Sequence, residues 1–293
     1  MPMDLDWMVW HRSPRKPQYI PPEGAVDAHC HIFGPEEVFP YSAERKYTPC
    51  TGSKDDLLAL RDHLGLSRNV IVQASCHGRN NDALIDGLRS AGDFARGVAV
   101  VDDSISAEEL QSMHEAGVRG VRFNFVRRLV DPKPREHYQK IVDKIAAMGW
   151  HIIVYIEAAD FADQIPFLKS LPVTVVFDHM ARPDISQGVD HPDFKRFLDL
   201  LEDEKFWTKV SCPERLTTHG GGHMNYSDVV PFMKRVVDSY PDRVLWGTDW
   251  PHPNMKSHMP DDGQLLELIP LIADNAEKQQ KLLVDNPMRL YWS

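Results

Sequence analysis

Short hydrophobic runs alternate with amphipathic stretches along most of the chain. The runs are rich in Val, Ile and Phe, and most are continuous rather than strictly alternating, which is typical of strands buried on both faces. The pattern predicts eight strands, over residues 25–33, 69–74, 95–101, 117–125, 150–158, 173–180, 206–212 and 243–250.

Five of the amphipathic stretches are expected to form helices, over residues 55–65, 106–117, 135–149, 191–204 and 226–240. Ser106 and Glu109 have the spacing of a capping box at the start of the second helix, and glycines end the second and third. Eight strands with interposed helices predict a (β/α)8 TIM barrel. An open doubly wound sheet is the alternative, but no G-x-G-x-x-G motif follows any of the strands.

The beginning of the chain has a different character from the rest. Residues 1–24 are rich in proline and show no regular period, so we expect an N-terminal arm there and a single barrel domain over residues 25–293. Two longer connections, 34–54 and 212–226, are expected to lie as loops over the mouth of the barrel.

Composition narrows the range of partners and compartments. The 293 residues are 42% hydrophobic and 26% charged, as in ordinary globular proteins, and no apolar run approaches the roughly 20 residues that cross a bilayer. Four cysteines without a C-x-x-C pair, and no signal-peptide pattern, indicate reduced thiols in the cytoplasm. The net charge of −10 argues against nucleic acid but not against an anionic small molecule. No pattern indicates an oligomeric state.

Titratable side chains collect where the predicted strands end, which is where barrels of this kind carry their chemistry. The first strand ends in DAHCH, so His29 and His31 lie on one face. The sixth strand ends with Asp178 and His179, and the eighth ends with Asp249. Three histidines and an aspartate at such positions together indicate a catalytic site rather than isolated structural residues.

Other polar side chains follow the remaining strands: Ser75, Arg122, Asn124, Tyr155, Glu157 and Arg215. His151 begins a strand and is expected to be structural, and Cys30 faces away from its histidine neighbours and is expected to pack. The remaining histidines fall in the arm, in helices or in loops and are expected at the surface: His11, His63, His77, His114, His137 and His191.

The order H-x-H, histidine, aspartate resembles the amidohydrolase superfamily, whose members are metal-assisted hydrolases on a distorted (β/α)8 barrel. Within it, seven stretches together resemble the pyrone-dicarboxylate lactonase family: DAHCHIFGP, NVIVQASCHG, RGVRFNF, RRLVD, DHMARPD, CPERL and WGTDWPHPN. They span residues 27–254, and their joint occurrence is specific, whereas H-x-H alone is not.

The resemblance implies a planar lactone with two carboxylates as the small-molecule substrate. It assigns Asp249 as the general base that activates water, and His29, His31 and His179 as hydrogen-bond donors to the lactone carbonyl. Arginine suits carboxylates because its planar fork makes bidentate contacts. The expected substrate-binding residues are Tyr47, Ser75, Arg122, Arg128, Tyr155, Arg215, His252 and Asn254, whereas Arg127 and Arg182 are expected to form surface ion pairs.

The sequence departs from the metal-dependent majority of the superfamily. Those members usually add a lysine or glutamate after the fourth strand or a histidine after the fifth, but here the strands offer Arg122, Asn124 and Tyr155. None of these is a zinc ligand, and arginines would repel a dication. We therefore expect no metal and no cofactor.

Two other functions stay open at this point. The histidines and the aspartate could hold a metal weakly, which would give a metal-dependent hydrolase or decarboxylase acting on another aromatic or dicarboxylic acid. A barrel that binds a dicarboxylate without turning it over is the alternative from another class. The cluster of His29, His31 and Asp249 counts against a pure binder, because binding needs the arginines but no base.

Overall fold

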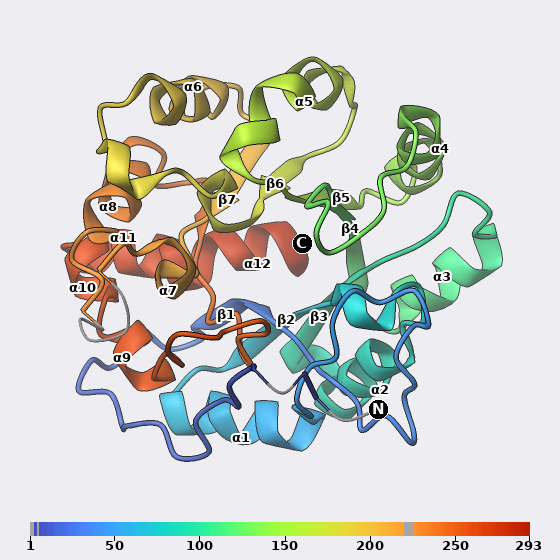
Figure 1. Ribbon diagram of the computed structural model, residues 1–293, viewed down its shortest axis with the longest axis horizontal. Coiled ribbons are helices and arrows are strands. Elements are labelled where there is room, and N and C mark those ends of the chain that lie inside the picture. Colours follow the sequence, from blue (N-terminus) through green and yellow to red (C-terminus); the bar gives the residue numbers. More distant parts are fainter. Residues whose placement is uncertain (1–2, 5, 220–224) are drawn as a thin grey trace.

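The structure, a computed structural model, describes residues 3–4, 6–219 and 225–293. Its centre is a sheet of eight parallel strands whose order in space is their order in the chain (Figure 1). The strands are β1 (Val26–Cys30), β2 (Arg68–Val72), β3 (Ala95–Ala99), β4 (Val118–Asn124), β5 (His151–Tyr155), β6 (Val175–Phe177), β7 (Phe206–Lys209) and β8 (Val244–Leu245). All eight predicted strands are confirmed, each shorter than its hydrophobic run.

The two ends of the sheet meet and close the barrel. Beyond β8, the carbonyl of Trp246 accepts the N–H of Ala28 at 2.9 Å, and the N–H of Asp249 donates to the carbonyl of His29 at 2.8 Å. This approach requires Gly247, because a Cβ there would lie 2.5 Å from the backbone nitrogen of His29. The predicted (β/α)8 barrel is confirmed, and its first and last strands meet at their carboxyl ends.

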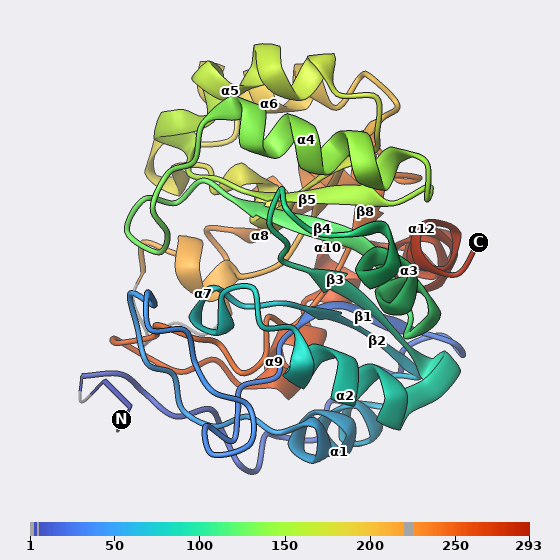
Figure 2. The same cartoon turned by 90° about the vertical axis from the view of Figure 1, so that its right-hand side faces the viewer.

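Helices flank the outside of the sheet (Figure 2). Up to β8 they are α1 (Lys54–Leu64), α2 (Asp82–Ala91), α3 (Ala107–Glu115), α4 (Arg135–Ala146), α5 (Ala158–Ser170), α6 (Pro192–Leu200), α7 (Pro213–Leu216) and α8 (Val230–Ser239). After β8 come α9 (Asp262–Leu266), α10 (Ile269–Ile272), α11 (Ala276–Gln280) and α12 (Asn286–Tyr291). Short 3-10 turns span Ser75–His77, Gly92–Phe94, Asp178–Ala181 and Ile185–Gln187, and a π turn spans Lys281–Asp285.

The five predicted helices correspond to α1, α3, α4, α6 and α8. The sequence predicts neither the short helices α7 and α9–α12 nor the longer helices α2 and α5. Each of these two contains a residue that weakens a helical pattern. In α2 it is Gly87, where a Cβ would lie 2.4 Å from Cδ1 of Ile32, so the glycine lets the helix pack closely on the chain after β1. In α5 it is Pro166.

One end of the barrel is filled by side chains and covered by α12. The cluster inside comprises Val26, Ala28, Val70, Val72, Val98, Ile153, Val176, Trp207, Leu245 and Tyr291. His151 is buried here, at the amino end of β5, with its ring 4.9 Å from that of Tyr291. Burial lowers the pKa of His151 to about 3, so this histidine is neutral and packs against the core, away from the carboxyl ends of the strands.

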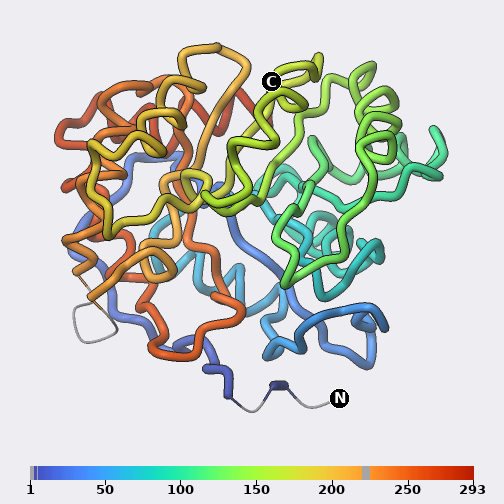
Figure 3. The backbone as a smooth tube through the Cα atoms, turned by 45° about the horizontal axis from the view of Figure 1, so that its top comes forward, coloured from blue at the N-terminus to red at the C-terminus, as the bar shows by residue number. Residues whose placement is uncertain are grey.

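The N-terminal segment lies along the loop that follows β8 (Figure 3). The N–H of Met8 donates to the carbonyl of Met255 at 2.9 Å, and the ring of Trp10 lies edge-on to that of Trp250 at 4.9 Å. The indole of Trp10 also donates to the carbonyl of Thr51 at 3.1 Å. The arm therefore braces the loop that presents Asp249.

All four cysteines are free thiols, as predicted. Cys30 packs on the outer side of the strands, where its Sγ donates to the carbonyl of Val70 at 3.4 Å. Within the described ranges, no helix combines the length and apolarity needed to cross a membrane. Of the connection expected over 212–226, residues 220–224 lie outside the described residues.

Candidate active site

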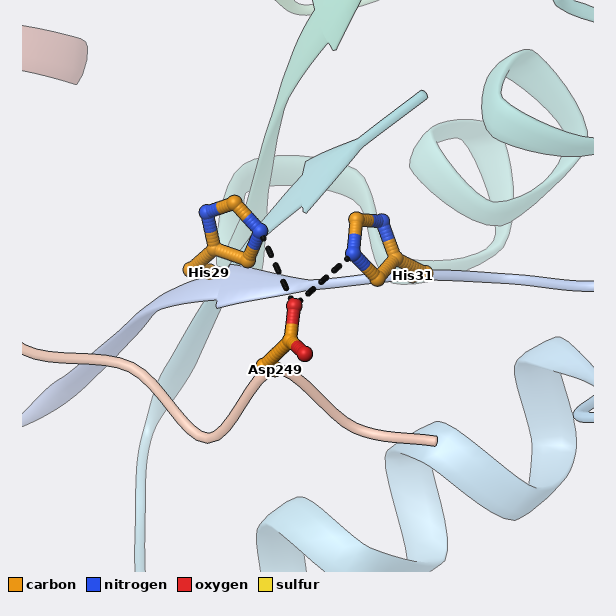
Figure 4. Close-up of side chains that lie close together, drawn as sticks. All are labelled: His29, His31 and Asp249. Atoms are coloured by element: carbon orange, nitrogen blue, oxygen red, sulfur yellow. Dashed lines mark hydrogen bonds and ion pairs between the residues drawn. The ribbon is translucent and has the colours of Figure 1, made fainter. Parts of the chain in front are cut away.

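His29, His31 and Asp249 converge at the carboxyl end of the barrel (Figure 4). The Nε2 atoms of His29 and His31 lie 3.3 and 3.1 Å from the same carboxylate oxygen, Oδ1 of Asp249. The histidines come from the end of β1, and the aspartate comes from the loop after β8. All three side chains are buried, so their charges interact with little screening by water.

The carboxylate of Asp27 holds this arrangement from below. Its Oδ1 accepts the backbone N–H groups of His29 at 3.1 Å and Thr248 at 3.0 Å, and its Oδ2 accepts the hydroxyl of Thr248 at 2.7 Å. Asp249 follows with φ of 63°, in the left-handed region that residues other than glycine seldom adopt. Backbone strain next to a buried carboxylate is typical of functional sites.

Nε2 of His31 and Oδ1 of Asp249 face each other and can hold one proton between them. The Nδ1 of His31 lies 2.7 Å from the carbonyl of Val72, so Nδ1 carries a hydrogen and donates it. A second proton on Nε2 would make the ring a cation that donates to Asp249. Burial lowers the pKa of His31 to about 4, so near neutral pH this second proton is absent and the pair can accept one.

A second buried carboxylate, Asp178, lies behind His29 and is surrounded by cations. Its Oδ2 accepts from Nε and Nη2 of Arg122 at 3.0 and 2.9 Å, and its Oδ1 lies 3.3 Å from the ammonium of Lys209 and 3.1 Å from Nδ1 of His29. Burial alone would raise the pKa of Asp178, but the cations Lys209 and Arg122 outweigh it and hold the pKa well below its usual range.

His179 completes the histidine cluster in a strained turn. Its φ is 53°, and its Nδ1 lies 2.7 Å from the hydroxyl of Ser211. Its Nε2 lies 3.9 Å from Oδ1 of Asp249 and 3.5 Å from the sulfur of Cys212. Burial lowers the pKa of His179 well below its usual range, so the ring is neutral and has one N–H to donate.

Arg215 covers the other oxygen of Asp249. Its Nε and Nη2 donate to Oδ2 at 3.0 and 2.7 Å. Burial alone would raise the pKa of Asp249, but Arg215 and the contact from His29 outweigh it and hold the pKa well below its usual range. Asp249 is therefore ionised, and its oxygens face cations or histidines on both sides.

A pocket opens above this cluster and is lined by His31, Tyr47, Ala74, Ser75, Arg122, Leu129, Tyr155, His179, Arg215, Asp249, Pro253 and Asn254. Nine of the twelve site residues expected from the sequence are among them. The pocket encloses about 20 Å³, but it shares Ser75, Arg122 and Leu129 with an adjoining cavity of about 460 Å³. A ligand larger than one or two waters must therefore occupy the shared region as well.

Three expected site residues do not line the pocket. His29 lies beneath it with no exposed side-chain surface, although its Nε2 still reaches Asp249. Arg128 points outward: its side chain is 48% exposed and donates to Glu157 at 2.9 Å. Arg182, expected at the surface, lies closer to the pocket than the sequence indicated, since its Nη1 donates to the hydroxyl of Tyr155 at 2.8 Å.

His252 is the third expected site residue that does not line the pocket. It lies in a separate buried cluster. Its Nε2 is 3.0 Å from Oδ1 of Asp262, and its Nδ1 is 3.7 Å from Oε1 of Glu214. Burial alone would lower the pKa of His252, but Asp262 and Glu214 outweigh it and raise the pKa to about 10. His252 therefore does not line the pocket, because its carboxylate partners hold it behind the loop.

His77, expected at the surface, is buried. The 3-10 turn after β2 places its ring 4.8 Å from that of Tyr41 and 6.4 Å from that of Phe33, and it accepts the N–H of Gly34 at 3.3 Å. The long connection over 34–54 folds onto the turn and covers it. The other five histidines expected at the surface are at least partly exposed.

Lys209 and Asp27 belong to the site although the sequence pattern did not indicate them. Lys209 alternates with Trp207, a member of the cluster inside the barrel, so it also faces inward. A lysine in a strand buried on both faces was the available signal, since lysine is almost never fully buried unless paired. For Asp27, the signal was an aspartate inside a hydrophobic run rather than at its end.

The donor atoms at this site suit a metal in distance but not in protonation. Nitrogen and oxygen ligands of tetrahedral zinc lie about 3.3 Å apart, close to the spacing of His29, His31 and Asp249. A ligating histidine, however, donates its other N–H to an acceptor, whereas the hydrogen-bond partner of Nδ1 of His29 is the ammonium of Lys209, at 2.8 Å. Oδ1 of Asp178 lies 3.1 Å from this nitrogen but makes no hydrogen bond to it. Arg215 already donates to Oδ2 of Asp249, and its charge would repel a dication beside this carboxylate. The residues present do not fit a dication.

A closed parallel barrel with histidines and a buried aspartate at its carboxyl end defines a class of enzymes, the hydrolytic (β/α)8 barrels. The family model described as amidohydrolase matches residues 26–292. The chain belongs to the amidohydrolase family, as its strand-end histidines indicated, and it is a hydrolase.

Individual relatives narrow the comparison. A 2-pyrone-4,6-dicarboxylate hydrolase of Comamonas testosteroni is 59% identical over 292 residues, which cover 98% of this chain and 96% of that protein. A 4-sulfomuconolactone hydrolase of Hydrogenophaga intermedia is 33% identical, over 94% of this chain and 90% of its own. A solved Agrobacterium tumefaciens structure, 24% identical, covers 94% of this chain and 98% of its own with a TM-score of 0.84, which supports the fold alone. The resemblance to the pyrone-dicarboxylate lactonases is confirmed.

Proposed function

We propose that the protein hydrolyses the lactone 2-pyrone-4,6-dicarboxylate to 4-oxalomesaconate, reversibly, in the breakdown of lignin-derived aromatic compounds. The observation that carries the proposal is one carboxylate, Asp249, set among three histidines at a pocket lined by two arginines. The relative that is 59% identical carries the name of this reaction. The four free thiols of this chain are consistent with a cytoplasmic location for the protein.

The arginines match a substrate with two carboxylates. Arg122 and Arg215 both line the pocket, and each uses its Nε and Nη2 on a protein carboxylate. The Nη1 atoms remain to bind ligand, and a carboxylate can also displace one of the internal contacts. Each charge-assisted contact contributes about 1.5–3 kcal/mol.

Substrate must then change the contacts of Arg215. The pocket encloses only about 20 Å³ while this arginine lies against Asp249. A ring with two carboxylates is larger, so it enters through the region shared with the adjoining cavity, beside Ser75 and Leu129. When Arg215 turns toward a substrate carboxylate, it uncovers an oxygen of Asp249 and removes the charge that most lowers the pKa of that base.

Hydrolysis begins with water beside Asp249. The water oxygen attacks the lactone carbonyl carbon, and its proton passes to the pair formed by Oδ1 of Asp249 and Nε2 of His31. This pair is unprotonated near neutral pH, because burial opposes the positive charge that a second proton would give His31. General-base catalysis of this kind contributes about 10²–10⁴ in rate.

The carbonyl oxygen gains negative charge as the tetrahedral intermediate forms. Neutral His179 has one N–H to donate, and His29 offers a second from Nε2, so the two rings stabilise the oxyanion. The ring C–O bond then breaks, and the proton that the Asp249–His31 pair took from water passes to the leaving enolate oxygen as the chain opens. The residues around Asp249 do not fit a dication, and we therefore propose a reaction without a metal cofactor.

The test is turnover of 2-pyrone-4,6-dicarboxylate by the purified protein, followed as loss of the pyrone absorbance. Asp249→Asn, which keeps the shape of the side chain, is the matched control and should lose about 10²-fold or more in kcat while remaining folded. 4-Sulfomuconolactone, a lactone bearing a sulfonate, is the comparison substrate. Folded wild type that turns over the sulfonated lactone but not the pyrone would contradict the proposed substrate.

A further inference from the structure

Lys209 is a fully buried ammonium inside the barrel, on the last residue of β7. Its Nζ lies 2.8 Å from Nδ1 of His29 and 3.3 Å from Oδ1 of Asp178. Burial lowers the pKa of Lys209, and Asp178 opposes that shift by stabilising the charge. A lysine in this position is costly to bury unless its partners need it.

The proton on His29 follows from this contact. A charged lysine has three donors and no acceptor, so Nδ1 of His29 accepts and carries no hydrogen. Oδ1 of Asp178 lies 3.1 Å from the same nitrogen, but it makes no hydrogen bond to the ring and instead lies 3.3 Å from the ammonium of Lys209. In the neutral ring the hydrogen then sits on Nε2, the atom 3.3 Å from Oδ1 of Asp249. His31 has the opposite arrangement, since its Nδ1 donates to the carbonyl of Val72. The two histidines of one motif are therefore in different tautomers.

We propose that Lys209 is a positioning residue that holds His29 as an Nε2–H hydrogen-bond donor and thereby closes the site to a metal ion. A metal-bound histidine needs a lone pair on its ligating nitrogen and an acceptor for its other N–H. Lys209 reverses both conditions at His29. The positive charge of Lys209 lies beside the far nitrogen of the His29 ring. There it strengthens the hydrogen bond that Nε2–H donates as negative charge develops on the reacting oxygen.

Only the effect on turnover rests on the proposed function. The tautomer of His29 and the exclusion of metal are properties of the free protein, so they can be measured without substrate. If the pyrone is not turned over but His29 is the Nε2–H tautomer, the proposed substrate fails and the role of Lys209 stands. If the pyrone is turned over but His29 carries its proton on Nδ1, the proposed substrate stands and the role of Lys209 fails.

The first measurement is the tautomer itself. Wild-type protein labelled with ¹⁵N-histidine is studied by long-range ¹H–¹⁵N correlation NMR, and His29→Gln assigns the signal of this ring among the 14 histidines. We expect the Nε2–H pattern at pH 7. A wild-type His29 that carries its proton on Nδ1 would overturn the proposal without any Lys209 variant.

The second measurement uses Lys209→Met, which keeps length but removes the donor. Nδ1 of His29 is then free to donate to Asp178, so the ring should change tautomer and zinc chloride, titrated alone, should bind about tenfold or more tighter than to wild type. We expect kcat to fall with KM little changed, and Lys209→Arg, which donates as lysine does, to restore the tautomer and part of kcat. Lys205→Met, a lysine outside the site, is the control. Unchanged tautomer and zinc affinity in folded Lys209→Met would contradict the proposal.

Discussion

Arg215 donates from two nitrogen atoms to one oxygen of Asp249, at 3.0 and 2.7 Å, at the mouth of the barrel. The residue expected to bind substrate and the residue expected to activate water are thus partners of each other in the free protein. This contact gives Arg215 two effects, since it binds an anion and it sets the pKa of the base.

Replacing Arg215 with glutamine should therefore change both binding and pH dependence. We expect kcat/KM to fall about ten- to hundredfold, from the loss of a charge-assisted contact. Removing the guanidinium also raises the pKa of Asp249, so the acid limb of the kcat/KM profile should move to higher pH. A pH–rate profile of wild type and variant measures the shift, and coincident acid limbs would show that Arg215 does not act on the base.

Arg122 and Arg128 should differ sharply, although both were expected from the sequence to bind carboxylate. Arg122 lines the pocket, whereas Arg128 is half exposed and paired with Glu157. We expect Arg122→Gln to lower kcat/KM about tenfold or more and Arg128→Gln to change it by less than about threefold, as for a surface pair.

A pyrone lacking one carboxylate makes this comparison specific. If Arg122 contacts that carboxylate, the penalties of variant and truncated substrate should be less than additive. Additive penalties for both carboxylates would mean that Arg122 acts only through Asp178, its protein partner.

His252 should make the stability of the fold depend on pH above neutrality. Its pKa is raised from 6.5 to about 10, against the effect of burial, by Asp262 and Glu214. A raised pKa contributes stability that is complete below pH 6.5 and is lost as pH rises through about 10. The slope from one proton is at most about 1.4 kcal/mol per pH unit.

The measurement is urea unfolding of wild type and His252→Gln between pH 6.5 and 10. We expect the free energy of unfolding of wild type to fall more steeply with pH than that of the variant. Taking the difference removes the contribution of the other groups that titrate in this range. Equal slopes would show that His252 is neutral in the folded protein.

Gly247 should be essential for the distance between base and histidines. A Cβ there would lie 2.5 Å from the backbone nitrogen of His29 and 2.6 Å from its Cβ. We expect Gly247→Ala to lose about 1–3 kcal/mol of stability by overpacking, and kcat to fall as β1 and the loop after β8 move apart.

Gly149→Ala is the control for this substitution. Gly149 lies before the amino end of β5, away from the site, with φ of 67°. A Cβ added there would have no neighbour within 4 Å. The alanine therefore costs about 1–2 kcal/mol of backbone strain but leaves the site alone. Thermal melts and kcat of the two variants are compared. Equal kcat in the two variants would show that the site tolerates separation of β1 from the loop after β8.

The fold and the central cluster could be predicted because they depend on local periodicity. Alternation along a strand places His29 and His31 on one face, and the carboxyl ends of parallel strands meet at one end of a barrel. Loops carry no such rule. The outward turn of Arg128, the inward turn of Arg182 and the burial of His77 depend on how connections fold onto each other, which no periodicity records.

Lys209 shows a different limit. Its inward direction could be predicted from the alternation of β7, but its meaning depends on which atom it touches, Nδ1 of His29. That contact joins residues 180 positions apart in the chain, and the protonation of a histidine follows only from its partners.

The most direct test of the central claim, hydrolysis by Asp249 without a metal, is the metal content and kcat of the same preparation before and after chelation. We expect far less than one zinc, iron or manganese ion per chain, and a kcat for 2-pyrone-4,6-dicarboxylate that chelator and added metal leave unchanged. About one tightly bound ion per chain, with activity lost on its removal and regained on its return, would contradict the claim.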